Sequence, residues 1–251
     1  MKEVLAFIHE KKQEFAQSPF IQYLQDTTID PRQRLAWAPC FAPFAMNFKD
    51  INRRVLRKEP ATSKVQEMIN QHTYEDGRHW IWFLQDLKLL GFDYSLNYTD
   101  TLKFLWGEET KKTRQLAHDL YAICTFQDNP IMHLPVIETI EATGNVALYE
   151  TANVADEIKQ ITNQHHPYFS KSHYDKESGH IQAHMEHIEV ENFLENIELT
   201  EEQRQKAFEL VEIVFVDFSD SMHEMYIFAQ NHSYQECFIE TAKNKLPLAV
   251  A

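Results

Sequence analysis

The chain has 251 residues, enough for one large domain or two small ones, and hydrophobic residues make up 43% of it, enough for a substantial core. Its 38 acidic and 24 basic residues give a formal charge of −14, which argues against binding to nucleic acid or anionic membranes, because phosphate groups would be repelled. Only 5 glycines are present, which disfavours a sheet-rich fold with many tight turns and a glycine-rich phosphate loop.

The first half of the chain predicts a series of helices separated by turn residues. Residues 2–17 form an amphipathic helical pattern, and the prolines and polar residues from 19 to 31 break it. A second helix is predicted from about Pro43. A long third helix is predicted over about 64–90, ending on Gly91, and a fourth over 99–125.

The second half continues in the same way. The sequence predicts a mostly apolar helix over 131–151, followed by a polar helix or loop to about 166 and then a helix over roughly 168–196. Thr200 and Gln203 form a capping box that opens a helix over 201–230, and 233–244 is expected to be a last short helix. Because no run with strand periodicity stands out, we expect a single all-α domain, residues 1–251, with about seven core helices.

Three widely separated cysteines, Cys40, Cys124 and Cys237, form no Cys-x-x-Cys pair and leave an odd thiol. This usage is typical of a reducing compartment, so a cytoplasmic protein is expected. The N-terminal residues are amphipathic and charged rather than a secretory apolar run, and no uninterrupted apolar stretch approaches 18 residues. We therefore expect no membrane partner.

A histidine-rich stretch in the predicted helix 168–196 is the strongest indication of chemistry. If it is helical, His173, Glu177, His180, His184 and His187 lie within an arc of about 80° on one face. Imidazole and carboxylate groups on one stripe can converge on iron, zinc or manganese. The alternative is a solvated polar face in a chain that contains 13 histidines.

The predicted helix 64–90 offers a second set of candidate ligands. His72 and His79 are seven residues apart and share a helix face, with Glu75 between them. Asp76 precedes His79 by three residues, which gives an Asp-x-x-His pair. The alternative here is a polar stripe beside a buried cluster of Trp80, Trp82 and Phe83.

The predicted helix 131–151 contains two glutamates, Glu138 and Glu141, within an otherwise apolar run. An ionised carboxylate is costly to bury unless it is paired or binds a metal, so at least one of them should face a partner inside the fold. A buried salt bridge is the alternative. Gly144, one turn after Glu141, would let a neighbouring helix or a substrate approach.

Three helices that each offer imidazole or carboxylate groups favour one shared metal site, and the number of groups suits two ions. Mixed His and carboxylate ligands favour iron over a structural zinc, which would prefer cysteine. A ferritin-like bundle would use two Glu-x-x-His pairs and two further glutamates. Glu177 and His180 form one such pair, but Asp76 and His79 are its only counterpart, and a second lone glutamate is missing.

The spacing His173-x3-Glu177-x2-His180 resembles the late helix of the heme-oxygenase-like di-iron oxidases and oxygenases, a group similar to the chlamydial protein associating with death domains. That group has His, a carboxylate four residues on, and His three further. It also has an early carboxylate seven residues before a His. Here the His is His79, but position −7 is His72, a departure for which Glu75 is the alternative carboxylate.

The group's central glutamate corresponds to Glu141, 36 residues before Glu177, with Glu138 in reserve. The resemblance implies a heme-oxygenase-like bundle that binds two Fe(II) ions per chain and activates O2 as co-substrate. Glu141 and Glu177 would then be catalytic. The metal ligands implied by the resemblance are His72, Glu75, His79, Glu141, His173, Glu177 and His180.

The resemblance also implies oxidation of a small organic acid. An amino acid is the favoured class, with N-oxidation, carbon–carbon cleavage, or nitrile formation from a tryptophan-like substrate as open alternatives. Arg78 could bind a substrate carboxylate in a bidentate contact, or pair with acids at the surface. The sequence leaves the oligomeric state open, with a homodimer as one alternative. Two other functions remain open on the same fold: a cofactor-free thiaminase-like hydrolase, and a non-enzymatic interaction protein.

Overall fold

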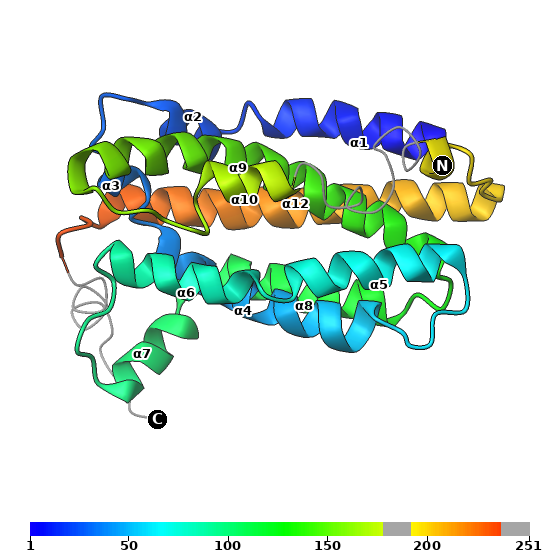
Figure 1. Ribbon diagram of the computed structural model, residues 1–251, viewed down its shortest axis with the longest axis horizontal. Helices are drawn as coiled ribbons and strands as arrows, with labels where there is room; N and C mark the ends of the chain where they lie inside the picture. The colour runs from blue at the N-terminus through cyan, green and yellow to red at the C-terminus, as the bar shows by residue number, and fades with distance from the viewer. Residues whose placement is uncertain (178–191, 237–251) are drawn as a thin grey trace.

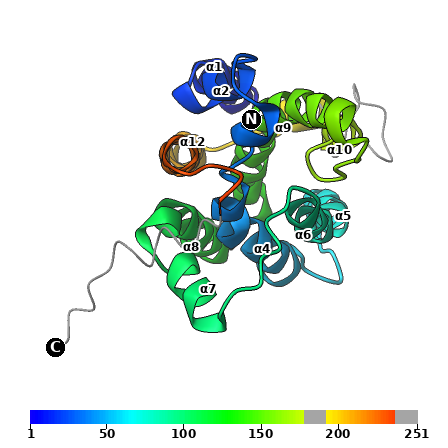
Figure 2. The same cartoon turned by 90° about the vertical axis from the view of Figure 1, so that its left-hand side faces the viewer.

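The computed structural model describes residues 1–177 and 192–236, and within these ranges every regular element is helical. The predicted all-α fold is therefore confirmed. The main helices run along the long axis of the molecule (Figure 1) and form a bundle when viewed from its end (Figure 2). They are α1 (Lys2–Phe15), α4 (Ala42–Ile51), α5 (Lys64–Asp76), α6 (His79–Leu89), α8 (Lys111–Thr125), α9 (Leu134–Thr162), α10 (Lys171–Glu177) and α12 (Glu201–Asn231).

Shorter elements connect the bundle helices. None of the described helices combines the length and the apolarity that a bilayer crossing requires. The short helices are α2 (Pro19–Gln25), α3 (Pro31–Arg34), α7 (Tyr98–Leu105), the 3-10 turns η1 (Ala38–Phe41), η3 (Glu108–Thr110) and η4 (Pro130–His133), and the π-helical turn η2 (Asn52–Leu56) that extends α4.

The two longest helices, α9 and α12, form the centre of the core, and α12 packs on α8, α9 and α1. Apolar residues recur along α12 at helical spacing, so one stripe of it is buried, from Ala207 and Leu210 to Phe228 and Ala229. The predicted capping box opens this helix: the Gln203 backbone N–H donates to Thr200 Oγ1 over 3.2 Å, and the Thr200 N–H donates to Gln203 Oε1 over 3.0 Å.

The predicted single helix over 64–90 is in fact two helices, α5 and α6, separated at Gly77 and Arg78. A Cβ atom at Gly77 would lie 2.9 Å from the Thr73 carbonyl oxygen, so a larger residue would have to displace the backbone. That carbonyl also accepts a 2.7 Å hydrogen bond from the Arg57 guanidinium. The break leaves Asp76 at the end of one helix and His79 at the start of the next. The predicted stop at Gly91 is confirmed, with φ at +86°.

Three other predicted helix boundaries are also wrong. The helix predicted over 99–125 is divided into α7 and α8 around Gly107, where Arg114 Nη1 donates to the Gly107 carbonyl over 2.8 Å. The helix predicted over 131–151 continues as α9 to Thr162, because Val154 and Ile158 extend its buried face, and it ends at Asn163 with φ at +57°. Of the two alternatives for the stretch up to 166, a helix or a loop, the helix is confirmed as far as Thr162. The short helix α2 lies in a region where only a break was predicted.

The last two predicted helices are described only in part. The helix predicted over 168–196 begins as α10 at Lys171, and its continuation after 177 lies outside the described residues until 192. Residues 232–236 are not helical, and the rest of the predicted last helix also lies outside the described residues.

Candidate metal centre and pocket

The break between α5 and α6 places Asp76 between two imidazoles. Asp76 Oδ2 lies 3.0 Å from His72 Nε2, one turn earlier on α5, and Asp76 Oδ1 lies 3.9 Å from Nδ1 of His79, at the start of α6. All three residues are buried. Each carboxylate oxygen therefore faces a different histidine, an arrangement in which one carboxylate can serve two neighbouring cations.

Glu141 joins this group from α9. Its Oε1 lies 3.7 Å from His72 Nε2, and one ligand atom each from His72, Asp76 and Glu141 lies within 4.8 Å of the others. Donor atoms bound to one transition-metal ion at about 2 Å are separated by about 3 Å, so small side-chain movements would bring all three onto one ion. Two carboxylates also compensate the charge of a divalent cation, and the donor set therefore fits a metal.

His173, on α10, lies on the other side of His79, and the two ring centroids are 4.5 Å apart. Nδ1 of His173 donates a 2.6 Å hydrogen bond to the Tyr168 carbonyl oxygen. Because a carbonyl can only accept, Nδ1 must carry the proton, which leaves the lone pair of the neutral ring on Nε2. This is the usual arrangement of a histidine that binds a metal through Nε2.

Asp86, on α6, fixes the segment that carries this carbonyl. Its buried Oδ2 accepts hydrogen bonds of 2.9 Å from the backbone N–H groups of both Tyr168 and Phe169. Burial raises the pKa of the Asp86 carboxyl to about 7, and the two N–H groups act in the opposite direction. Asp86 of α6 therefore holds the Tyr168 backbone, and the Tyr168 carbonyl in turn holds the His173 ring in one orientation.

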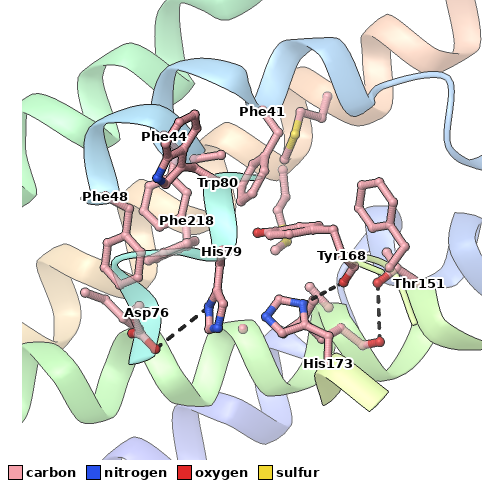
Figure 3. A pocket seen from close by; sticks show the side chains of 18 of the residues that line it. Phe41, Phe44, Phe48, Asp76, His79, Trp80, Thr151, Tyr168, His173 and Phe218 are labelled. Carbon is pink, nitrogen blue, oxygen red and sulfur yellow. Dashed lines mark hydrogen bonds and ion pairs between the residues drawn. The ribbon is translucent and has the colours of Figure 1, made fainter. Parts of the chain in front are cut away.

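The imidazoles and carboxylates border a pocket between α4, α9 and α12 (Figure 3). The pocket offers about 90 Å³ to the centre of a water-sized sphere, and one water needs roughly 10–15 Å³ by that measure, so a small organic group can be held. Its polar lining consists of Asp76, His79, Glu141, Thr151, Tyr168 and His173. Most of the remaining lining is aromatic or aliphatic, including Trp37, Phe41, Phe44, Phe48, Trp80, Phe218, Met222 and Met225.

The structure brings four of the sequence candidates into this region: His72, His79, Glu141 and His173. Glu75 is half-buried and accepts a 2.6 Å hydrogen bond from the Gln71 side chain, and it does not line the pocket. Glu138 is half-buried and likewise does not line the pocket. Arg78 is exposed and is not among the described residues that line it.

The remaining candidates on the predicted late helix are not placed. Glu177 ends α10, but its side chain lies outside the described part of the structure, as do His180, His184 and His187. Sequence reasoning did not select Asp76 as a ligand, although the Asp-x-x-His spacing and the i, i+4 relation to His72 were both visible. It also missed Asp86 and Tyr168, whose contacts join segments more than 80 residues apart.

Comparison with known proteins found no family model and no curated protein that matches the chain. A solved structure does match it, a domain of unknown function with a heme oxygenase-like fold from Shewanella denitrificans OS217. The TM-score is 0.60 over 92% of this chain and 93% of that chain. The fold is heme-oxygenase-like. This confirms the fold expected from the sequence resemblance. At 16% identity, the likeness carries the heme-oxygenase-like fold alone, and the di-iron chemistry stays a prediction.

Proposed function

We propose that this chain is a non-heme di-iron oxygenase or oxidase that uses O2 to oxidise a small organic molecule, with an amino acid as the class expected from the sequence. The observation that carries the proposal is the buried group of imidazoles and carboxylates from α5, α6, α9 and α10, which borders an apolar pocket. A redox metal beside an enclosed apolar space is the arrangement that oxidation of a bound organic substrate requires.

Two overlapping sets of residues would hold the ions. His72, Asp76 and Glu141 would bind one ion. His79 and His173 would bind the other, with the second oxygen of Asp76 beside His79. The sequence resemblance adds two further ligands, Glu177 and His180, whose side chains lie outside the described part of the chain.

The bound iron would supply the redox chemistry with O2, and the protein residues would do the rest. The aromatic wall formed by Phe41, Phe44 and Phe218 would exclude water and hold the apolar part of the substrate. Glu141 lies at the boundary between the metal-binding group and the pocket, so the ion that it would bind would face the substrate. The Tyr168 carbonyl would keep the His173 ring in one tautomer.

The thiaminase-like alternative is weakened at Cys40 and Cys124, the two cysteines that the structure describes. Such a hydrolase needs a reactive thiolate, but burial raises the pKa of Cys40 well above its ordinary value and raises the pKa of Cys124 to about 12. Both thiols are therefore protonated at neutral pH. If the chain were a non-enzymatic interaction protein, these polar residues would lie on solvated helix faces. The side chains of His72, Asp76, His79 and His173 are instead buried, which weakens this alternative.

Anaerobic titration with Fe(II) tests the proposal. We expect two Fe(II) ions to bind per chain, and the visible absorption to change when O2 is admitted. His79→Ala should lose at least one of the two ions. The control is His9→Ala, which removes an exposed imidazole on α1 that pairs with Gln13. If the titration of the wild-type protein reaches its plateau at one ion or none, the two-ion hypothesis is wrong.

A further inference from the structure

The face of α9 that borders the pocket contains a glycine at its centre. The lining residues of this helix follow helical spacing, and Gly144 lies one turn after Glu141. A Cβ atom placed at Gly144 would meet no heavy atom of the described residues within 4 Å. Within residues 1–177 and 192–236, the glycine is therefore not needed for close packing of a neighbouring helix. Of the two roles expected from the sequence, approach of a helix or of a substrate, the open space favours the second.

The wall opposite α9 is apolar. Phe44 stacks on Phe48 with ring centroids 5.2 Å apart, and Phe218 meets Phe44 edge to face at 5.3 Å. Met222 and Met225 continue this wall along α12. Aromatic rings and thioethers provide favourable contacts to an uncharged ring or aliphatic chain.

Among the described residues that line the pocket, the charged ones all belong to the metal-binding group. They are the carboxylates of Asp76 and Glu141, and this described lining includes no lysine or arginine. The ammonium of Lys49 lies 5.2 Å from the ring centroid of Trp80, a lining residue, but it pairs there with Asp50 at 3.9 Å. A charged group on the substrate, away from the candidate metal centre, would thus be buried against aromatic rings, with no opposite charge in the described lining.

We propose that the substrate has an uncharged, apolar body, an aromatic ring or a short aliphatic chain, that lies against Gly144, and that its polar reacting end faces His79 and His173. Residue 144 then determines which bodies fit. This inference deepens the proposed function, because the molecule that it describes is the substrate of that oxidation. It narrows the amino-acid class to members with apolar side chains and excludes those with a charged side chain, because an unpaired buried charge is costly.

Matched pairs of small probes test the charge requirement. Hexylamine and 1,6-diaminohexane differ only in a charge at the far end, as do hexanoate and adipate. We expect the singly charged member of each pair to bind the iron-loaded, anaerobic protein at least about tenfold more tightly than the doubly charged member. Titration calorimetry measures both affinities. Equal affinity within both pairs would overturn the proposal.

A graded series at Gly144 tests the position of the body. Affinity for hexylamine should fall from Gly144→Ala to Gly144→Val to Gly144→Leu, by about tenfold in the last, because each side chain occupies more of the pocket. Iron per chain should stay unchanged. The control is Asn153→Leu, which adds the same side chain at an exposed position of α9 and should leave hexylamine binding unchanged.

Two readouts keep the outcomes distinct. If Gly144→Leu lacks the helical circular dichroism of the wild type, the Ala and Val variants decide by the same affinity measurement. Unchanged affinity across the folded variants would overturn the role of residue 144. If the wild-type protein binds no iron but the Gly144 series still weakens hexylamine binding, the proposed oxidation fails while the apolar pocket remains.

Discussion

Asp76→Ala is expected to lower the affinity for Fe(II) by at least ~100-fold, because removal of groups that only support a metal ligand already costs about 10–100-fold. The Asp76→Ala variant would lose a metal ligand itself, because the two Asp76 oxygens lie 3.0 Å from His72 Nε2 and 3.9 Å from His79 Nδ1. The measurement is iron per chain after anaerobic reconstitution and desalting, with circular dichroism to verify that the helices are intact.

The neighbouring carboxylate provides a matched control. Glu75→Ala removes a carboxylate that pairs with Gln71 and does not line the pocket, so this variant should keep its iron. The opposite result, loss of iron in Glu75→Ala and retention in Asp76→Ala, would restore the carboxylate expected from the sequence and would contradict the arrangement around the α5–α6 break.

Asp86→Ala is expected to lower the free energy of unfolding by about 2–6 kcal/mol, because the backbone N–H groups of Tyr168 and Phe169 lose their acceptor, at about 1–3 kcal/mol for each buried orphan. Asp86→Asn keeps an acceptor oxygen and should lose much less. Urea unfolding of the iron-free protein measures both changes. Equal losses in the two variants would show that the carboxylate, rather than the acceptor oxygen, holds the segment.

The same residue should give the stability a defined pH dependence. Burial raises the pKa of Asp86 from 3.8 to about 7, so between these values the folded protein binds more protons than the unfolded chain. The stabilising contribution is fully present below about pH 4 and is lost as the pH rises through 7. Urea midpoints from pH 5 to 8 should therefore fall more steeply in the wild type than in Asp86→Asn. Parallel curves would assign the pH dependence to another group.

The sequence predicted those parts of the fold that depend on local signals. The Thr200–Gln203 capping box and the Gly91 stop are both set by residues within a few positions of each other, and both are confirmed. The break at Gly77 could not be predicted in this way, because a single glycine is tolerated within a helical pattern. At the break, the Thr73 carbonyl accepts a hydrogen bond from Arg57 of a different segment, and a Cβ atom at Gly77 would lie 2.9 Å from that carbonyl oxygen.

The candidate site was predictable to a similar extent. Helical spacing placed His72 and His79 on one face, and the family resemblance singled out Glu141 and His173. The fold brings all four residues into one region. The sequence left His72 and Glu75 as alternatives at the early helix and did not select Asp76. Recognising Asp76 required knowing which side of α5 faces α9, and this depends on tertiary packing. The role of Asp86 depends on a contact with residues 82 and 83 positions away, for which no short-range pattern exists.

The distribution of the donor groups among separate helices also affects how the chain is held together. His72, Glu141 and His173 span about a hundred positions of the sequence, and they come from α5, α9 and α10. The two ions that these residues and Asp76 would bind would act as cross-links that close long loops of the chain, and they would stabilise the folded state in proportion to the logarithm of the free ion concentration. Iron supply would then set the resistance of this protein to proteases as well as its activity.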